Sequence, residues 1–418
     1  MKLPLSRLPR THRIKISVME GDLRPSSVDN IESDLPSSKE EVLERIREVK
    51  TGSESGLKDY PLYPRRWMEV NATSGIESAK KIRVMQFNIL AEGLSADPER
   101  KPPFEDGRAG KKADSSTWGN FDSIEEPKVV LNFATRKVRI LEEIVRNSPD
   151  IVALQEMDRY HDYFGPVLEH LGYESKWSCK LDSPSLKFGY YSDGVCICWK
   201  KDRFNLEAEA MDNSVEFEGK QVAVNHVLLT LKPKDWNGVP FVCVTTHLKA
   251  KATSENEQKR SKQITALLTK VTDFAKLHNA GERILLCGDF NCDPFDIYKS
   301  KGEGGGGGRE LDYKAICVPH IQESFPNIQS AYPLENAAEN ADDADSSKWL
   351  WTTWKKRSAG GVGEVKHSID YIYYDKNNFN CTQILLPPDP EYVMEHRLPC
   401  YKYPSDHISI VADFDFIR

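Results

Sequence analysis

The sequence predicts an α/β protein built from packed β-sheets with helices on their outer sides. Short apolar runs separated by turns recur from Lys81 onward, and only two long segments have the spacing of amphipathic helices. The 418 residues are enough for one large hydrophobic core or two ordinary ones. A chain that is 39% hydrophobic and 29% charged is neither disordered throughout nor membrane-spanning. These observations together indicate packed sheets of one large domain.

The expected elements follow from the apolar patterns in chain order. Strands are expected at residues 82–88, 150–156, 195–200, 221–231, 240–247, 283–291, 368–374 and 407–416. Helices are expected at about 131–147 and at about 256–278, where Gly281 lies beyond the end of the second helix. Three stretches break the pattern and are interpreted as surface loops: 96–128, 302–309 and 335–347.

The start of the chain differs in composition from the rest. Residues 1–77 are predicted to form an N-terminal tail, followed by the main folded domain at 78–418. Residues 1–19 are basic and contain no acidic residue, so we interpret them as a solvated disordered segment, with a mitochondrial transit peptide as the alternative. Residues 38–50 carry a capping signal and a narrow apolar stripe, which predict a short amphipathic helix. That helix is expected to dock on the main domain or on a protein partner.

Charge and cysteine content exclude several classes of protein. The formal net charge of −7 argues against a protein that coats nucleic acid by charge alone, although a local basic patch would still bind a polyanion. No window approaches the roughly 18 apolar residues of a membrane-spanning helix. The nine cysteines include no CxxC pair, which indicates reduced and mostly buried thiols. We therefore expect a cytoplasmic protein without a zinc site or a disulfide framework.

Polar side chains lie where the expected strands end, or where the last two strands begin. If those last two strands run antiparallel to the others, all of these groups meet at one rim, where ligands commonly bind. Taken singly, most of them are ordinary turn formers, surface carboxylates or structural histidines. Together they would require repeated coincidence at strand ends, so we interpret them as one site. The residues are Asn88, Glu156, His247, Asp289, Asn291, Asp370, Asp406 and His407.

Oxygen-rich side chains of this kind favour a hard metal ion. Carboxylate and amide oxygens without thiolates are typical of Mg²⁺ sites, with Mn²⁺ as the alternative ion. Glu156 is expected to be the best single ligand. Asn88, Asp289 or Asp406 would complete the coordination directly or through water, and of these Asp406 is our second metal ligand. The chemistry that such a set supports is hydrolysis at phosphorus.

The remaining polar groups suit proton handling and charge stabilisation. Asp370 is expected to fix the tautomer of His407 and to stabilise its cation. His247 is expected to donate to a phosphoryl oxygen. Asp289 and Asn291 are expected to orient the attacking water.

Seven motifs resemble those of the exonuclease–endonuclease–phosphatase superfamily, and within it the branch that also contains the poly(A) deadenylases. They run in the order of that family from Lys81 to Phe416, and Phe87 stands where a tryptophan is usual. The resemblance implies a two-sheet α/β sandwich with helices on its outer faces, and a Mg²⁺-dependent phosphohydrolase site made by the same eight residues. The motifs are QFNIL (86–90), LQEMD (154–158), THLKAK (246–251), GDFNCDP (288–294), TTWKKR (352–357), SIDYI (368–372) and YPSDH (403–407).

The substrate is indicated by basic residues around these motifs. Superfamily members cut RNA, DNA, phosphoinositides and sphingomyelin, so the fold alone does not define the substrate. The resemblance implies that basic residues at matching positions bind the 2′-phosphate of NADP(H), which is then hydrolysed to NAD(H). Those residues are Lys180, Lys249, Lys251 and Arg357, with Lys251 standing where an arginine is expected. The leading hypothesis is therefore a Mg²⁺-dependent NADP(H) 2′-phosphatase.

Two alternatives remain. A poly(A)-specific 3′-exoribonuclease acting on mRNA would need stacking aromatics, and Trp349, Trp351 and Trp354 lie near a site motif. The acidic segment 335–347 just before them would repel a long polyanion, which favours a dinucleotide. The other alternative is a catalytically silent module of the same fold, recruited to RNA-decay or circadian partners through the 38–50 helix. It ranks last because no expected metal ligand or histidine is missing.

Overall fold

A computed structural model describes residues 35–51, 60–71, 80–95, 121, 124–234, 238–294, 297–300, 311–332, 351–357 and 363–417. The helices are α1 (Lys39–Thr51), α2 (Pro127–Val130), α3 (Phe133–Asn147), α4 (Gly165–His170), α5 (Ser254–Leu277), α6 (Cys317–Ser324) and α8 (Pro390–Val393). The strands are β1 (Trp67–Glu69), β2 (Lys81–Asn88), β3 (Ile151–Gln155), β4 (Tyr173–Cys179), β5 (Gly194–Lys200), β6 (Phe204–Phe217), β7 (Lys220–Pro233), β8 (Phe241–His247), β9 (Ile284–Asp289), β10 (Ile297–Ser300), β11 (Leu311–Lys314), β12 (Ile328–Ser330), β13 (Thr353–Arg357), β14 (Gly363–His367), β15 (Asp370–Asp375), β16 (Phe379–Leu385) and β17 (Ile410–Phe416).

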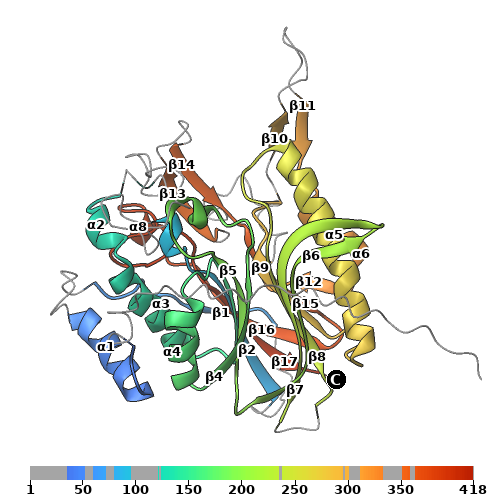
Figure 1. Cartoon of the computed structure of the whole chain (residues 1–418), viewed down its shortest axis with the longest axis horizontal. Helices are drawn as coiled ribbons and strands as arrows, with labels where there is room; N and C mark the ends of the chain where they lie inside the picture. Colours follow the sequence, from blue (N-terminus) through green and yellow to red (C-terminus); the bar gives the residue numbers. More distant parts are fainter. Residues whose placement is uncertain are drawn as a thin grey trace, which may run out of the picture. The chain divides into compact units, whose positions relative to one another are not determined.

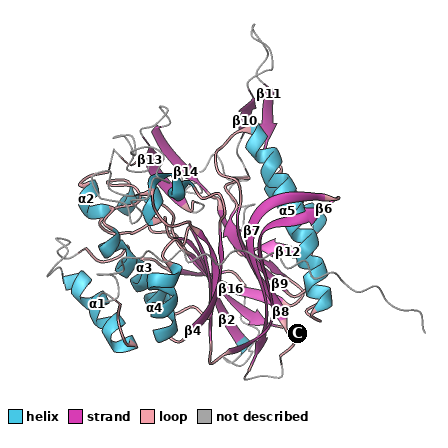
Figure 2. Cartoon of the chain, viewed as in Figure 1, coloured by secondary structure: helices cyan, strands magenta, loops and turns pink. Residues whose placement is uncertain are grey.

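Two mixed β-sheets pack face to face, with helices outside them (Figures 1 and 2). The first sheet has seven strands in the order β1-β16-β17-β2-β3-β5-β4, and the second has six in the order β12-β15-β9-β8-β7-β6. Strands β2 and β3 are parallel, as are β8 and β9, whereas β17 and β15 run antiparallel to their neighbours β2 and β9. The predicted sandwich and the predicted reversal of the last two site-bearing strands are therefore both confirmed.

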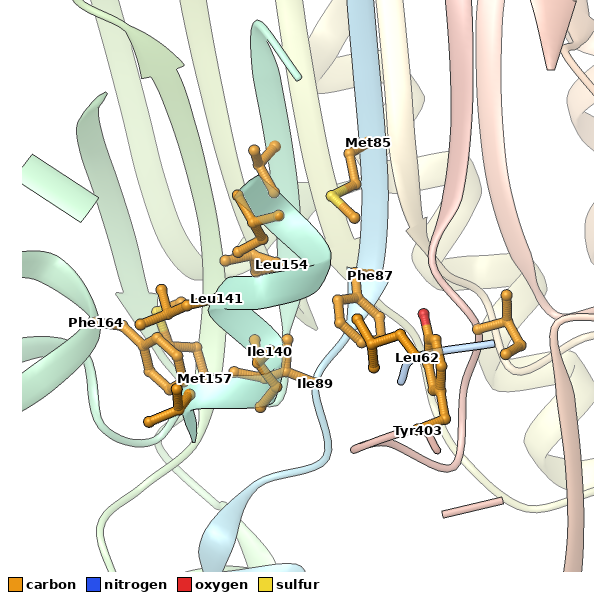
Figure 3. Close-up of a cluster of buried hydrophobic side chains, with 14 of the residues drawn as sticks. Leu62, Met85, Phe87, Ile89, Ile140, Leu141, Leu154, Met157, Phe164 and Tyr403 are labelled. Atoms are coloured by element: carbon orange, nitrogen blue, oxygen red, sulfur yellow. The ribbon is translucent and has the colours of Figure 1, made fainter. Parts of the chain in front are cut away.

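Residue alternation along the strands gives each sheet apolar side chains on both faces, and these form one core between the sheets and one core outside each sheet. In β2, Ile82 and Val84 face the second sheet, whereas Met85 and Phe87 pack outward against α3. Figure 3 shows this outer core, where Phe87 lies beside Tyr403 and the helical residues Ile140 and Leu141 pack on Leu154. A third core separates the second sheet from α5 and α6. The side-chain period of two that a strand imposes thus divides the molecule into four layers.

Helix α1 and strand β1 belong to the compact unit, which begins at Leu35. Val42 and Ile46 of α1 are buried in the outer core with α3 and α4, and β1 pairs with β16. The expected boundary at residues 77 and 78 therefore lies inside the unit, because the segment before it supplies core residues and a strand. The apolar stripe of the 38–50 helix is used within the chain, so a protein partner would contact the charged face of α1.

Other expectations are met in part or fall outside the described residues. All nine cysteines are free, and eight of them are buried. The basic segment 1–19 lies outside the described residues. So do the stretches expected to be loops, except for residues 121 and 124–128. In the part of the chain that the structure describes, no helix is long and apolar enough to cross a membrane.

Candidate active site

Strand alternation turns the four predicted site residues that lie on strands toward the opposite sheet. Asn88 continues the face of β2 that carries Ile82 and Val84, and His247 continues the face of β8 that carries Phe241 and Cys243. By the same period, Asp289 of β9 and Asp370 of β15 lie in phase with residues of the core between the sheets. The apolar residues determine which face of each strand packs against the other sheet. The polar residue near the strand's end therefore lies on that same face.

The register of the strands then aligns these residues side by side, at the same position along neighbouring strands. Asp289 is the direct partner of His247 in the parallel pair β8–β9 and of Asp370 in the antiparallel pair β9–β15. Asn88, from the other sheet, donates from Nδ2 to Asp289 Oδ2 over 3.0 Å and to Glu156 Oε1 over 3.1 Å. One amide thus bridges two carboxylates from different sheets. Asn88 and Asp289 are buried, so this contact is shielded from water.

Asp370 and His407 form the predicted pair. His407 Nδ1 lies 2.8 Å from Asp370 Oδ2, and both side chains are buried. Burial lowers the pKa of His407, but the nearby carboxylates of Asp370, Asp406 and Asp289 outweigh it and raise the pKa to about 9. The imidazolium therefore keeps a proton on Nε2, and Nε2 lies 3.8 Å from Asp289 Oδ2.

His247 flanks Asp289 on the other side and has the opposite protonation. Its Nε2 lies 3.5 Å from Asp289 Oδ2. Burial lowers the pKa of His247 to about 4, with Asp289 opposing this effect and the positive charge of Lys180 adding to it. Near neutral pH the structure thus places a neutral histidine and a protonated one on either side of the same carboxylate.

The acidic residues of the rim suit a divalent cation. Burial raises the pKa of Glu156, and the negative charge of Asp406 raises it further. A cation between such carboxylates would relieve their mutual repulsion, so the donor set fits a hard metal ion. Glu156 has a left-handed backbone, with φ of 58°, and its Oε2 accepts a hydrogen bond from the Ala91 amide over 3.2 Å. These contacts hold the carboxylate at a strand end.

Asp289, Asp370 and His407 form a second group of potential metal ligands, but two of them are already bonded to each other. Ligand atoms of Asp289, Asp370 and His407 lie within 4.8 Å of one another. Asp370 and His407 are hydrogen-bonded to each other, so only Asp289 of the three is well placed to turn toward a cation. Asp406, the predicted second ligand, pairs with Lys355 Nζ at 2.5 Å. Lys355 of the β13–β14 hairpin thus neutralises the Asp406 carboxylate.

Asn291 lies beside Asp289, with which it is expected to orient the attacking water; that role stays a prediction. Its Nδ2 donates to the Leu248 carbonyl oxygen over 3.2 Å, and its backbone amide donates to Asp289 Oδ1 over 2.9 Å. The side-chain amide therefore ties the segment after β9 to the segment after β8. Its contacts orient Asp289 and the neighbouring loop, because the amide nitrogen is used on a backbone carbonyl.

The predicted substrate-binding lysines lie next to His247. Lys180 is half-buried and close enough to lower the pKa of His247, whereas Lys249 and Lys251 are exposed. Arg357 ends β13, where it pairs with Gly363, and its side chain lies outside the described part of the structure. One lysine thus lies near His247, and two exposed lysines follow in the segment after β8; their binding of substrate stays a prediction.

Two of the three tryptophans near the site motif, Trp351 and Trp354, are not available to stack on bases. Trp351 and Trp354 are buried against each other, and Lys366 and Arg397 cover the ring of Trp354. The expectation that these two side chains could stack on bases is therefore wrong. Trp349 lies outside the described residues.

Two glutamines beneath the site were missed by the sequence reasoning. Gln86 and Gln155 are fully buried neighbours on β2 and β3, and their side-chain amides bond to each other. Gln86 Nε2 also donates to Asp370 Oδ1 over 3.1 Å, and Gln155 Nε2 donates to Thr245 Oγ1 over 3.0 Å. The available signal was a polar residue inside an apolar strand, the same signal that singled out Asp370.

Comparison with known proteins agrees with this geometry. The profile of the Endonuclease/Exonuclease/phosphatase family matches residues 85–407. Nocturnin of Homo sapiens is 32% identical over 80% of this chain, and the match covers 65% of that relative, just under two thirds of its length. Nocturnin of Xenopus laevis is 30% identical over 88% of this chain and 82% of its own. The solved human Nocturnin catalytic domain with bound sulfate is 26% identical, with a TM-score of 0.55 over 84% of this chain and 98% of its own.

Proposed function

Because this chain belongs to the endonuclease/exonuclease/phosphatase family, we propose that it is a Mg²⁺-dependent phosphatase that removes the 2′-phosphate of NADP⁺ and NADPH. The observation that supports this proposal is the positive charge near His247. Lys180 is close enough to His247 to lower its pKa, and Lys249 and Lys251 follow His247 two and four positions later with exposed side chains. A terminal phosphate dianion is held best by several cations. The relative solved with sulfate, a tetrahedral dianion, supports an anion site in this fold.

The residues of the site divide the work of hydrolysis. Glu156, with Asp289 or Asp406, would hold the metal ion, which when bound supplies Lewis-acid stabilisation of the phosphoryl oxygens. Asp289 would orient water and accept its proton. Protonated His407 would donate from Nε2 to a phosphoryl oxygen, the role expected of His247, because His247 is neutral near pH 7. Asp370 holds His407 in that orientation. The oxygen of water forms the new bond to phosphorus as the bond from phosphorus to the ribose 2′-oxygen breaks. The proton that Asp289 took from water goes to the 2′-oxygen, which leaves as a hydroxyl group.

The main competing activity is 3′-exonucleolytic removal of poly(A). Two of the tryptophans expected to stack on its bases are buried, which favours the dinucleotide. Two exposed lysines and a half-buried one suit a short, highly charged end group better than an extended chain. The catalytic residues would serve either substrate, so the two activities are separated by assay.

The deciding experiment measures phosphate release from NADP⁺ by the purified protein with Mg²⁺, beside a Glu156→Ala variant. We expect release by the wild type and a loss of about 100-fold or more in the variant, because a metal ligand is removed. A melting temperature within a few degrees of the wild type would show that the variant is folded. Absence of release by the wild type, together with shortening of a 3′-poly(A) RNA in the same buffer, would overturn the phosphatase proposal.

A further inference from the structure

The loop that carries Lys249 and Lys251 is held through its backbone by helix α5. Arg260 of α5 donates from Nη1 to the carbonyl oxygen of Lys249 over 2.8 Å and to that of Lys251 over 3.0 Å. The Arg260 side chain is fully buried under the loop. One guanidinium nitrogen thus fixes two peptide groups in the segment that follows His247.

A second residue of α5 holds the same loop. Gln263 lies about one helical turn after Arg260, on the same face of the helix. The backbone amide of Lys249 donates to Gln263 Oε1 over 3.0 Å, and Gln263 Nε2 donates to the Ala223 carbonyl of β7 over 2.6 Å. Both polar groups of the Lys249 backbone are therefore bound by α5, which packs along β7 (Figure 1).

Glu257 anchors Arg260 and connects it to the other side of the site. Its Oε2 accepts from Arg260 Nε over 2.7 Å, and its Oε1 accepts from the amides of Ile316 and Cys317 over 2.7 and 2.8 Å. Cys292, which follows Asn291, also directs its Sγ to Glu257 Oε1 at 3.4 Å. Both carboxylate oxygens of Glu257 and the Nε and Nη1 atoms of Arg260 are thus hydrogen-bonded, which favours a buried ion pair.

The loop has an unfavourable backbone that these contacts maintain. Lys251 has φ of 80°, a left-handed conformation that costs a non-glycine residue about 1–3 kcal/mol. Strain of this kind persists only where the surroundings over-determine the conformation. The hydrogen bonds from Arg260 and Gln263 supply that constraint, and so the lysine loop is ordered by the fold itself.

We infer that Arg260 is a positioning residue that sets the site's selectivity for a nucleotide-borne phosphate. It acts by fixing the backbone from which Lys249 and Lys251 extend; this rests on the proposed function, in which those lysines bind the substrate. A loop already ordered in the free protein does not lose conformational freedom on binding, which increases affinity. Arg260 reaches the loop through two backbone carbonyl groups, whereas Asn88, Asp289 and Asp370 extend from strands, so we expect the chemical step to depend little on Arg260.

The test replaces Arg260 by lysine, which keeps the charge opposite Glu257 and loses the fork that reaches the loop. Exchange of backbone amides in residues 248–252 should accelerate about 10-fold or more, while exchange in α3 stays unchanged. The KM for NADP⁺ should rise about 10-fold, equivalent to 1.4 kcal/mol, with kcat within about twofold. Hydrolysis of a small phosphate monoester without a nucleotide should change by less than about twofold.

Gln263→Ala is the second variant, because residue 263 is only half-buried and its loss leaves the core intact. It should raise the same KM and accelerate the same amides. In a Lys249→Ala background, Arg260→Lys should raise the KM much less than in the wild type, because the two residues act in series. Fully additive losses would contradict the inference.

Other outcomes separate this inference from the proposed function. Equal losses on NADP⁺ and on the small ester, with a lowered melting temperature, would make Arg260 a residue of general stability and overturn its role in selectivity. Unchanged amide exchange in Arg260→Lys would overturn the inference whichever substrate is hydrolysed. Failure of the wild type to release phosphate from NADP⁺, with accelerated exchange in Arg260→Lys, would overturn the proposed substrate and support the positioning of the loop.

Discussion

Gln86 and Asp370 lie on different sheets and are joined by a hydrogen bond of 3.1 Å from the amide Nε2 to Oδ1. The other oxygen of Asp370 contacts His407. Both oxygens of this buried carboxylate are therefore assigned, one to the histidine and one to the opposite sheet. Because the carboxylate cannot rotate without losing a bond, the packing of the two sheets determines how His407 is oriented.

Replacing Gln86 by methionine should lower kcat about 10-fold or more, because Asp370 loses the bond that fixes its plane. Stability should fall by about 1–3 kcal/mol, since the buried Gln155 amide loses both hydrogen bonds to Gln86 and keeps only the one to Thr245. Gln155→Met is the matched control: it breaks the same amide pair but does not contact Asp370. Denaturant unfolding and steady-state kinetics check both variants. Equal kcat losses in the two would contradict the role assigned to Gln86.

Lys249→Ala should raise the KM for NADP⁺ about 10-fold and leave hydrolysis of a small phosphate monoester within about twofold. The lysine is exposed beside His247, so its removal takes charge from the rim and leaves the core unaltered. Lys276→Ala removes an equally exposed lysine from the last turn of α5 and should have no effect on either substrate. Comparable losses on both substrates in Lys249→Ala would assign the lysine to chemistry or folding.

His226 should make the protein sensitive to mild acid. It is buried on β7 with Nδ1 2.9 Å from the Val224 carbonyl oxygen, and burial together with Lys270 lowers its pKa to about 4. The unfolded chain takes up a proton below about pH 6.5, whereas the folded chain does so only near pH 4. Stability should therefore fall as the pH drops from 6.5 to 4, by up to about 1.4 kcal/mol per pH unit, and be unaffected by this group above 6.5.

Urea unfolding at pH 7.5 and pH 5 measures this effect. His226→Leu should lose less stability than the wild type between the two pH values, because the group that gains a proton on unfolding is absent. His170→Leu, at an exposed position of α4, should keep the wild-type dependence. An unchanged pH dependence in His226→Leu would show that other groups cause the acid sensitivity.

Ile46→Ala in α1 should lower the free energy of unfolding by about 2 kcal/mol or more, because the side chain is only 6% exposed in the outer core. Arg47→Ala, at the neighbouring exposed position, should change it by less than about 0.5 kcal/mol. Thermal melts of the two variants test whether α1 is docked in solution. Identical melting temperatures would indicate a detached helix.

Much of the site could be predicted because the apolar residues of a buried strand reveal where that strand ends. Asn88, His247, Asp289 and Asp370 each follow or begin such a run, and the structure brings all four together. Strand β6 was not predicted, because its alternate residues are charged and exposed and the pattern resembles a loop. Strand β1 is too short to show any period.

Contacts across the rim could not be predicted, since they depend on how separate segments pack. The pairing of Lys355 with Asp406 requires the β13–β14 hairpin to fold over the site, and nothing in TTWKKR specifies that direction. The use of the Asn291 amide on Leu248 likewise depends on the distance between two loops. Sequence periodicity gives the face of a strand but not the partner of a side chain.

The position of β17 has a consequence for synthesis of the protein on the ribosome. This strand lies between β16 and β2, in the interior of the first sheet, and the segment just before it carries Ser405, whose hydroxyl bonds to the Asn88 carbonyl 317 positions earlier. At about 5–20 residues per second, β2 is exposed for tens of seconds before its partner emerges. The edge of β2 that pairs with β17 therefore stays unpaired for that time. Enzymatic activity can begin only after that strand has left the ribosomal tunnel.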